Sequence, residues 1–163
     1  MTRCPLAFLV VLSLAIPAGS IQGSMPASMP ALPPADLSYI PAAYRHDIAL
    51  AASVCGVPVR ILAGVAFAES SFRPDPAHAD PLDRGMFGLH ESTDIRAERV
   101  AKYGEYDPLD PGTAAIVAAR ILAEHRVNFG DWSRAIAAYR QGASGVRRDG
   151  IGWWYVERVR NGI

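Results

Sequence analysis

The segment spanning residues 61–72 constrains the fold of this chain more than any other. Its first eight residues carry no polar side chain, and Glu69 follows them. This composition is typical of a buried helix. Glu69 comes seven residues after Leu62 and four after Val65. On a helix it therefore lies on or near their side, which we expect to face the core or a cleft.

A carboxylate in that position is unusual, because Glu is rarely buried without a partner. Desolvation raises the pKa of a carboxyl group, and the C-terminal end of a helix dipole also disfavours its ionised form. Both effects favour a proton donor near neutral pH, which general acid catalysis requires. The alternative is that Glu69 turns outward on the last helical turn and is an ordinary solvated carboxylate.

Composition allows one domain and excludes several function classes. The chain has 163 residues, of which 50% are hydrophobic and 20% charged, enough for a single core. Zero formal net charge and the lack of a long basic run argue against a nucleic-acid partner. The four histidines form no metal-ligand pair, and neither a Gly-x-Ser-x-Gly motif nor a phosphate loop is present. We therefore expect no metal and no other cofactor.

The N-terminus predicts export. Arg3 precedes an apolar run at 5–16 that is too short to span a bilayer, and the small residues at 17–20 suit cleavage. Residues 1–20 are expected to be a signal peptide that directs the chain to the periplasm and leaves no stable membrane span after removal. An uncleaved N-terminal anchor is the alternative. Cys55 would then be the one remaining cysteine, a small buried hydrophobe or a partner for another chain.

Prolines and glycines divide the rest of the chain into a linker and a helical domain. Residues 21–38 are rich in Pro, Ala and Ser, and they predict a linker without a core. The domain then covers 39–163. Its predicted helices, placed by apolar spacing and by Asp, Thr, Pro and Gly at their ends, are 41–54, 58–70, 93–103, 111–128, 132–139 and 153–160.

Two segments of the domain are predicted to be irregular. Residues 72–88 contain many Pro, Asp and Gly residues, so we expect a long loop there, and such loops are more often functional than idle. Residues 142–152 are rich in glycine, and in the helix after them we expect Trp153 or Trp154 to pack inward. No run alternates long enough to require a sheet. The predicted fold class is all-α, with five or six helices and a long cleft loop.

Three segments, in order along the chain, carry a resemblance to a known family. Residues 58–74 form a helix that ends in Glu-Ser, followed by an aromatic residue and a proline. Residues 85–93, Gly-Met-Phe-Gly-Leu-His-Glu-Ser-Thr, are similar to a Gly-Leu-Met-Gln motif, and residues 137–142, Ala-Ala-Tyr-Arg-Gln-Gly, to an Ala-Tyr-Asn-Ala-Gly motif. Over residues 44–145 the chain resembles the lytic transglycosylases of the SLT family, which have a lysozyme-like fold.

The resemblance implies a set of site residues. Glu69 would be the catalytic residue, with Ser70 beside it in the substrate site. Met86 and Phe87 would form an apolar floor against sugar faces. Tyr139 would hydrogen-bond the Glu69 carboxyl or the N-acetyl group of the substrate, unless it is a core tyrosine.

The sequence departs from the family pattern at three positions. Gly88 stands where the family has Gln, and Arg140 stands where it has Asn. Both belong to the implied substrate site, so sugar contacts there must differ. Arg140 is either a candidate partner for a peptide carboxylate or a solvated or ion-paired residue at a helix end. Glu91 replaces a proline, and it is either a surface glutamate of the loop or a second carboxylate in the cleft.

The resemblance implies cleavage of the β-1,4 bond between N-acetylmuramic acid and N-acetylglucosamine in peptidoglycan glycan strands. Glu69 would protonate the leaving oxygen and then accept a proton from the C6 hydroxyl, which attacks intramolecularly and forms a 1,6-anhydro ring. An intramolecular nucleophile has a large entropic advantage, so one carboxyl group can suffice. The small size resembles specialised transglycosylases that open the wall for a secretion or pilus assembly.

Two other hypotheses remain open from the sequence. A muramidase that hydrolyses the same bond would need a second carboxylate, for which Asp80, Asp83 and Glu91 are candidates. A non-catalytic protein that binds or organises peptidoglycan would be consistent with the departures at Gly88 and Arg140.

Overall fold

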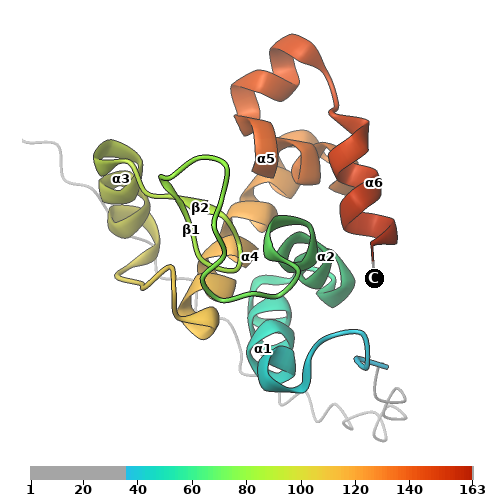
Figure 1. Ribbon diagram of the computed structural model, residues 1–163. Coiled ribbons are helices and arrows are strands. Elements are labelled where there is room, and N and C mark those ends of the chain that lie inside the picture. Colours follow the sequence, from blue (N-terminus) through green and yellow to red (C-terminus); the bar gives the residue numbers. More distant parts are fainter. Residues whose placement is uncertain (1–35, 163) are drawn as a thin grey trace, which may run out of the picture. The chain divides into compact units, whose positions relative to one another are not determined.

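The computed structural model describes residues 36–162, so the predicted signal peptide and most of the predicted linker lie outside the described part. Its elements, in chain order, are the 3-10 turn η1 (Ala42–Tyr44), α1 (Arg45–Cys55), α2 (Val59–Ser70), β1 (Asp83–Arg84), β2 (Leu89–His90), α3 (Thr93–Tyr103), α4 (Pro111–Phe129), α5 (Trp132–Asp149) and α6 (Trp153–Asn161). Six α-helices and one small hairpin over this range confirm the predicted helical class (Figure 1). No helix in this range is long and apolar enough to cross a membrane.

Several helix ends follow the sequence signals, but Thr93, expected to cap the 93–103 helix, is the first residue of α3, and Ser92 takes the cap position without a side-chain hydrogen bond. The Asp110 carboxylate accepts the Thr113 N–H at 2.9 Å at the start of α4, where Pro111 occupies the first turn. The Asp131 side chain accepts the Arg134 N–H at 2.9 Å at the start of α5. Gly56 ends α1 in the left-handed conformation, with φ of 65°.

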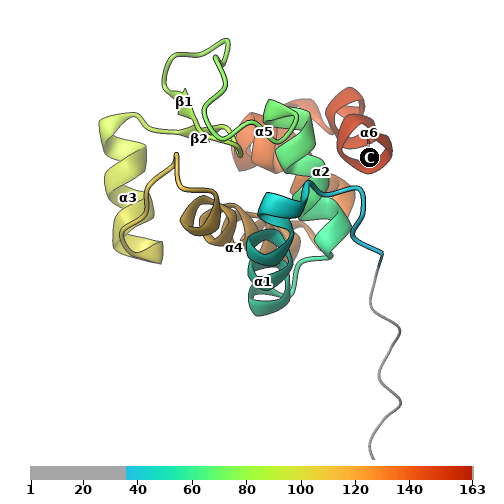
Figure 2. The same cartoon turned by 60° about the horizontal axis from the view of Figure 1, so that its bottom comes forward.

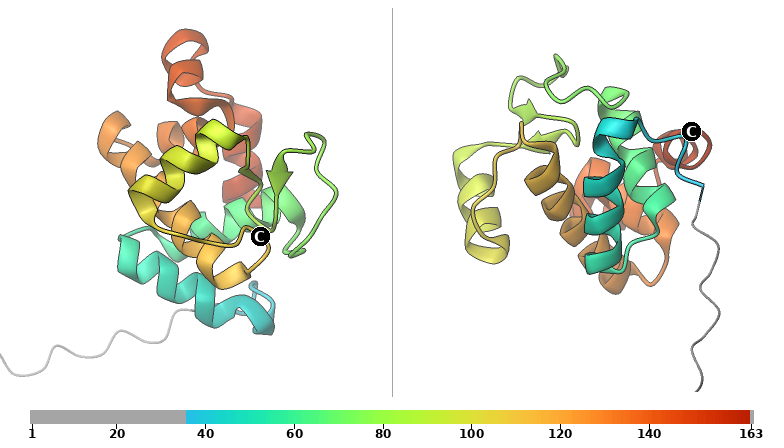
Figure 3. Two further views of the ribbon diagram at one scale, coloured as in Figure 1. Left: turned by 90° about the vertical axis from the view of Figure 1, so that its left-hand side faces the viewer. Right: turned by 90° about the horizontal axis from the view of Figure 1, so that it is seen from below.

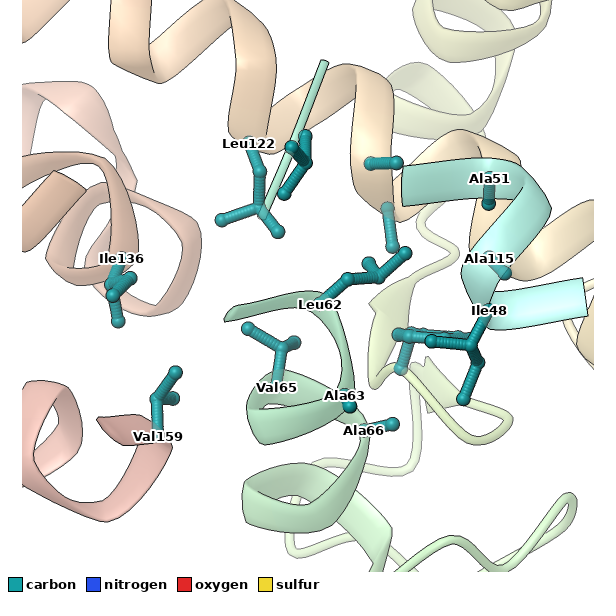
Figure 4. Packing of buried hydrophobic residues seen from close by; sticks show 14 of the residues in the cluster. Ile48, Ala51, Leu62, Ala63, Val65, Ala66, Ala115, Leu122, Ile136 and Val159 are labelled. Carbon is teal, nitrogen blue, oxygen red and sulfur yellow. The ribbon is translucent and has the colours of Figure 1, made fainter. Parts of the chain in front are cut away.

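Helix α4 lies at the centre of the domain. In two views it lies between α3 on one side and the α1–α2 pair on the other (Figures 2 and 3). Its buried alanines let α1 and α5 pack closely against it, and Leu122 is fully buried in the core. Around α2, Val65 faces Val159 of α6 and Ile136 of α5 (Figure 4).

The packing of the domain begins before the predicted boundary at residue 39. Leu37 and Tyr39 pack against the core, and Ile40 is fully buried. The Arg45 Nε–H donates to the carbonyl oxygens of Leu37 and Ile40 at 3.0 and 2.9 Å, which fixes this segment to α1.

The predicted loop at 72–88 contains the first strand and the turn of a hairpin that the sequence did not indicate, and the second strand follows directly. Strands β1 and β2 pair antiparallel, with Asp83 opposite His90 and Arg84 opposite Leu89. Strands of two residues are too short to produce an alternating pattern, so periodicity could not find them. The rest of the loop, from Phe72 to Asp80, holds no helix or strand.

Two predictions about the C-terminal part are wrong. Helix α5 does not end at Tyr139 but continues to Asp149, with a break at Gly142, where φ is 75° and ψ is 157°. Neither tryptophan at the start of α6 packs inward, since Trp153 is 54% exposed and Trp154 is 64% exposed. The inward residue is Tyr155, at 3% exposure.

Candidate active site

Helix α2 stops abruptly just after Glu69 and Ser70. Ser71 and Phe72 both have a positive φ, 54° and 62°, which is rare for residues other than glycine. Phe72 is buried and packs against Phe67 with ring centroids 6.1 Å apart, so core packing stabilises this turn. Glu69 is therefore placed at the rigid end of a buried helix.

Within residues 36–162, the Glu69 carboxyl has one hydrogen-bond partner. The Tyr155 hydroxyl of α6 donates a hydrogen bond of 2.6 Å to Glu69 Oε1. Burial is the largest influence on this group and raises the pKa of Glu69 above its usual value, while the Tyr155 hydrogen bond acts in the opposite direction. The net shift is upward, as the sequence predicted for a proton donor.

Gly88, in the turn between β1 and β2, lies against the other carboxyl oxygen. A Cβ at this position would be 2.8 Å from Glu69 Oε2 and 3.1 Å from its carboxyl carbon. The φ of Gly88 is +58°, a conformation that favours glycine. Any side chain at position 88 would displace the Glu69 carboxyl. A glycine here, in place of the Gln expected from the motif, therefore leaves room for the carboxyl in its observed position.

Glu69 lines a cleft of about 670 Å³. Residues of the hairpin, α3, α5 and α6 line this cleft, together with Ile121 of α4. Polar groups converge beside the acid, as in many ligand sites. The residues that line it include Glu69, Asp83, Gly88, His90, Tyr139, Arg140, Trp154 and Tyr155.

Asp83 is a second carboxylate in this cleft. Its Oδ1 lies 2.9 Å from His90 Nδ1, and its Oδ2 lies 3.7 Å from an Arg140 guanidinium nitrogen. The negative charge of Asp83 contributes to the raised pKa of Glu69, whereas the positive charge of Arg140 lowers it. Arg140 is therefore ion-paired, as one of the two sequence alternatives stated, and half of its side chain still faces solvent.

Among the described residues, Asp80, Asp83 and His90 form a cluster of side chains of the types that bind metal cations. Their ligand atoms lie within 4.8 Å of one another. The Arg140 guanidinium beside Asp83 adds a fixed positive charge that opposes binding of a cation. We assign no metal to the group.

The profile of the transglycosylase SLT domain matches residues 48–151, well over half of the chain. The chain belongs to the transglycosylase SLT family. Membership implies that it binds peptidoglycan and acts as a transglycosylase. The matched part of this SLT domain includes Glu69, the hairpin and Tyr139, and it ends before α6 begins. No curated protein matches the chain.

Some residues of the SLT motifs do not line the cleft. Ser70 is 2% exposed and its hydroxyl donates to the Ala66 carbonyl oxygen at 2.9 Å, so it serves its own helix. Met86 and Phe87 are fully buried and have no surface to offer a sugar. Both belong to the core beneath the cleft, because the hairpin turn tucks them inward.

Tyr139 of the third SLT motif lies in the cleft but does not bond the acid. Its hydroxyl donates to the Phe87 carbonyl oxygen at 2.8 Å, which ties α5 to the hairpin turn. The bond to Glu69 that was one of its expected roles is made by Tyr155 instead. Tyr155, one helix later, belongs to none of the three motifs. Its spacing of four residues from the apolar Val159, which is also buried, is the sequence signal that could have placed it inward.

Glu91 is neither a solvated loop residue nor a catalytic carboxylate. Its side chain is 11% exposed and pairs with Arg96 at 2.5 Å and Arg99 at 2.8 Å. The Tyr106 hydroxyl donates to it at 2.6 Å. This network joins β2, α3 and the segment before α4, so the role of Glu91 is to hold one wall of the cleft.

Proposed function

We propose that this protein is a lytic transglycosylase that cleaves the β-1,4 bond between N-acetylmuramic acid and N-acetylglucosamine and leaves 1,6-anhydromuramic ends. The observation that carries the proposal is Glu69, a desolvated carboxyl of raised pKa at the cleft surface, held by Tyr155 in a chain of the SLT family. A protonated carboxyl beside an open cleft is the group that glycosidic bond cleavage requires.

The mechanism needs one residue to act twice. Glu69 first donates its proton to the leaving oxygen, and positive charge develops at the sugar carbon. The ionised carboxylate then accepts the proton of the C6 hydroxyl as that oxygen closes the anhydro ring. The Tyr155 hydrogen bond stabilises the ionised form between the two steps and keeps the reacting oxygen in place.

The second candidate function is hydrolysis of the same bond, and the presence of Asp83 in the cleft is the observation behind it. Asp83 lines the cleft with Glu69, and a second carboxylate is what a hydrolase uses to activate water or to attack the sugar. Its pairing with both His90 and Arg140 occupies its oxygens, which supports transglycosylation as the first choice. Mass analysis of digested peptidoglycan separates the two, because anhydro ends indicate transglycosylation and reducing ends indicate hydrolysis.

The place of action is also a proposal. The leader-like residues 1–20 support export to the periplasm, where peptidoglycan is the substrate. Within the family, the role that we propose is to open the wall for a secretion or pilus assembly. Fractionation of cells that express the full chain would test the location.

The decisive substitution is Glu69→Gln, which keeps the shape of the side chain and removes its proton transfer. We expect release of soluble fragments from peptidoglycan to fall at least about a hundredfold, the usual range for loss of a general acid. Glu98→Gln, at an exposed position on α3, is the matched control and should keep full activity. Near wild-type activity of Glu69→Gln would exclude the assignment. Wild-type protein that binds peptidoglycan without releasing fragments would instead indicate the non-catalytic alternative.

A further inference from the structure

The first turn of α6 presents two neighbouring tryptophans in different surroundings. Both are exposed, Trp153 at 54% and Trp154 at 64%. Trp154 lines the cleft that contains Glu69 and also a smaller adjoining pocket of about 230 Å³, whereas Trp153 lines neither. Single exposed apolar residues are common on protein surfaces, but an exposed aromatic ring in a polar ligand cleft indicates a binding function.

The Trp154 ring is connected to Glu69 through Tyr155. It packs edge-on against the Tyr155 ring, with centroids 5.6 Å apart and planes at 76°. Tyr155 in turn donates its hydroxyl to Glu69 at 2.6 Å. The acid, the tyrosine and the tryptophan are therefore linked by direct contacts, and a ligand on the Trp154 ring lies beside the reacting bond.

The backbone that carries Trp154 is fixed. Gln141, the last residue before the break in α5, donates from Nε2 to the Gly150 carbonyl oxygen at 2.7 Å. Its Oε1 accepts the Gly152 N–H at 3.2 Å. One side chain thus joins the middle of α5 to the start of α6. This bridge sets the direction of the first turn of α6 before any ligand binds, which lowers the entropic cost of binding.

We propose that Trp154 is a sugar-stacking residue, which takes the apolar face of one pyranose ring of the glycan strand next to the cleavage site. A flat indole provides a large apolar area, and the axial C–H groups of a pyranose form a matching apolar face while its hydroxyl groups point outward to polar partners. Arg140, in the same cleft, is one such partner. The inference rests on the proposed function in so far as the ligand is a peptidoglycan glycan.

Binding to a cleavage-deficient protein tests the proposal directly. The parent is Glu69→Gln, and the probe is a tetrasaccharide of alternating N-acetylglucosamine and N-acetylmuramic acid, titrated by calorimetry and by tryptophan fluorescence. Adding Trp154→Ala should weaken binding about tenfold, which corresponds to about 1.4 kcal/mol. Trp154→Phe should retain much of the affinity, since it keeps an aromatic face.

Trp153→Ala is the matched control, because it removes another exposed tryptophan from the same helix turn but outside the cleft. It should bind like the parent and still show the fluorescence change. Equal affinity of the parent and Trp154→Ala would overturn the proposal, as would an equal loss in both alanine variants or a parent that does not bind. Trp154-dependent binding by the Glu69→Gln parent, together with a wild-type protein that cleaves no peptidoglycan, would uphold this inference and reject the proposed activity.

Discussion

Glu69 is subject to opposing influences that together decide its protonation. Burial raises its pKa most, and the negative charge of Asp83 adds to that effect. The Tyr155 hydrogen bond lowers the pKa, and so does the positive charge of Arg140. A group that must donate a proton and then accept one benefits from such a balance, because its ideal pKa lies near the working pH.

Tyr155→Phe tests this balance at a single atom. The hydroxyl stabilises the ionised carboxylate, so its loss should raise the pKa of Glu69 further and move the alkaline limb of the pH–rate profile to higher pH. The rate itself should fall about tenfold, the value of one hydrogen bond to a charged group. Activity measured across the pH range gives both quantities.

Tyr103→Phe is the control for that substitution. The Tyr103 hydroxyl also donates to a carboxylate at 2.6 Å, that of Glu124, but neither residue lines the cleft. It should leave the pH–rate profile unchanged. A similar displacement of both profiles would mean that Tyr155 acts through general stability and not on the acid.

At the scale of elements, the hairpin limits the space available to the Glu69 carboxyl. Its turn carries Gly88 against the carboxyl of Glu69, and Tyr139 of α5 holds the adjacent Phe87 carbonyl oxygen. The Glu91 network connects the other end of the hairpin to α3. Two residues per strand therefore suffice, because contacts on both sides fix the turn.

Gly88→Ala should greatly reduce activity while the protein remains folded. The added Cβ would meet Glu69 Oε2 at 2.8 Å, so the carboxyl must move from its place beside Tyr155. A displacement of this kind in an active site can lower the rate by about a hundredfold. The check is peptidoglycan cleavage together with a thermal melt.

Gly104→Ala isolates the cause. Gly104 also has a positive φ, 90°, but its added Cβ would meet nothing within 4 Å. Both substitutions cost about 1 kcal/mol of stability from backbone strain, so both melts should fall by a similar amount. If Gly104→Ala lost as much activity as Gly88→Ala, strain and not contact with Glu69 would explain the effect.

At the scale of the whole domain, the site depends on how closely α2 and α6 approach. Gly64 of α2 lies so near α6 that a Cβ there would be 2.1 Å from the Val159 carbonyl oxygen. This approach lets Tyr155 of α6 reach Glu69 of α2 across 86 positions of sequence. The Arg158 Nε–H also donates to the Ala68 carbonyl oxygen at 3.1 Å, at the same end of α2.

Gly64→Ala should therefore affect stability and activity together. Separating the two helices opens the core around Val159 and moves Tyr155 away from the acid, and overpacking of this kind costs about 1–3 kcal/mol. Denaturant unfolding measures the loss of stability, and peptidoglycan cleavage measures the loss of activity at a temperature where the variant is folded.

Gly145→Ala is the matched control in α5. Its added Cβ would come no closer than 3.4 Å to another side chain, and alanine favours a helix. It should leave stability equal or slightly higher. A Gly64→Ala protein as stable and active as wild type would show that the close approach of α2 and α6 is not needed.

The sequence by itself determined the helical class, the Asp110 and Asp131 caps, the family, and the position of Glu69 on the apolar side of its helix. These depend on local pattern: apolar spacing, Asp before a first turn, and motifs in order. The break in α5 and the hairpin were not predictable in this way, because one glycine and two-residue strands give no periodic signal. The buried places of Met86 and Phe87 were also misjudged, since a motif does not say which of its residues point outward.

Only the tertiary structure decided what surrounds the acid. Tyr155, Gly88 and Asp83 meet Glu69 because α6, the hairpin turn and β1 converge on the end of α2. The same convergence turned Trp154 toward the cleft and not into the core. Such contacts join residues far apart along the chain, and they follow from packing of whole elements. A sequence pattern marks which side of a helix is buried, but packing decides which partner it meets there.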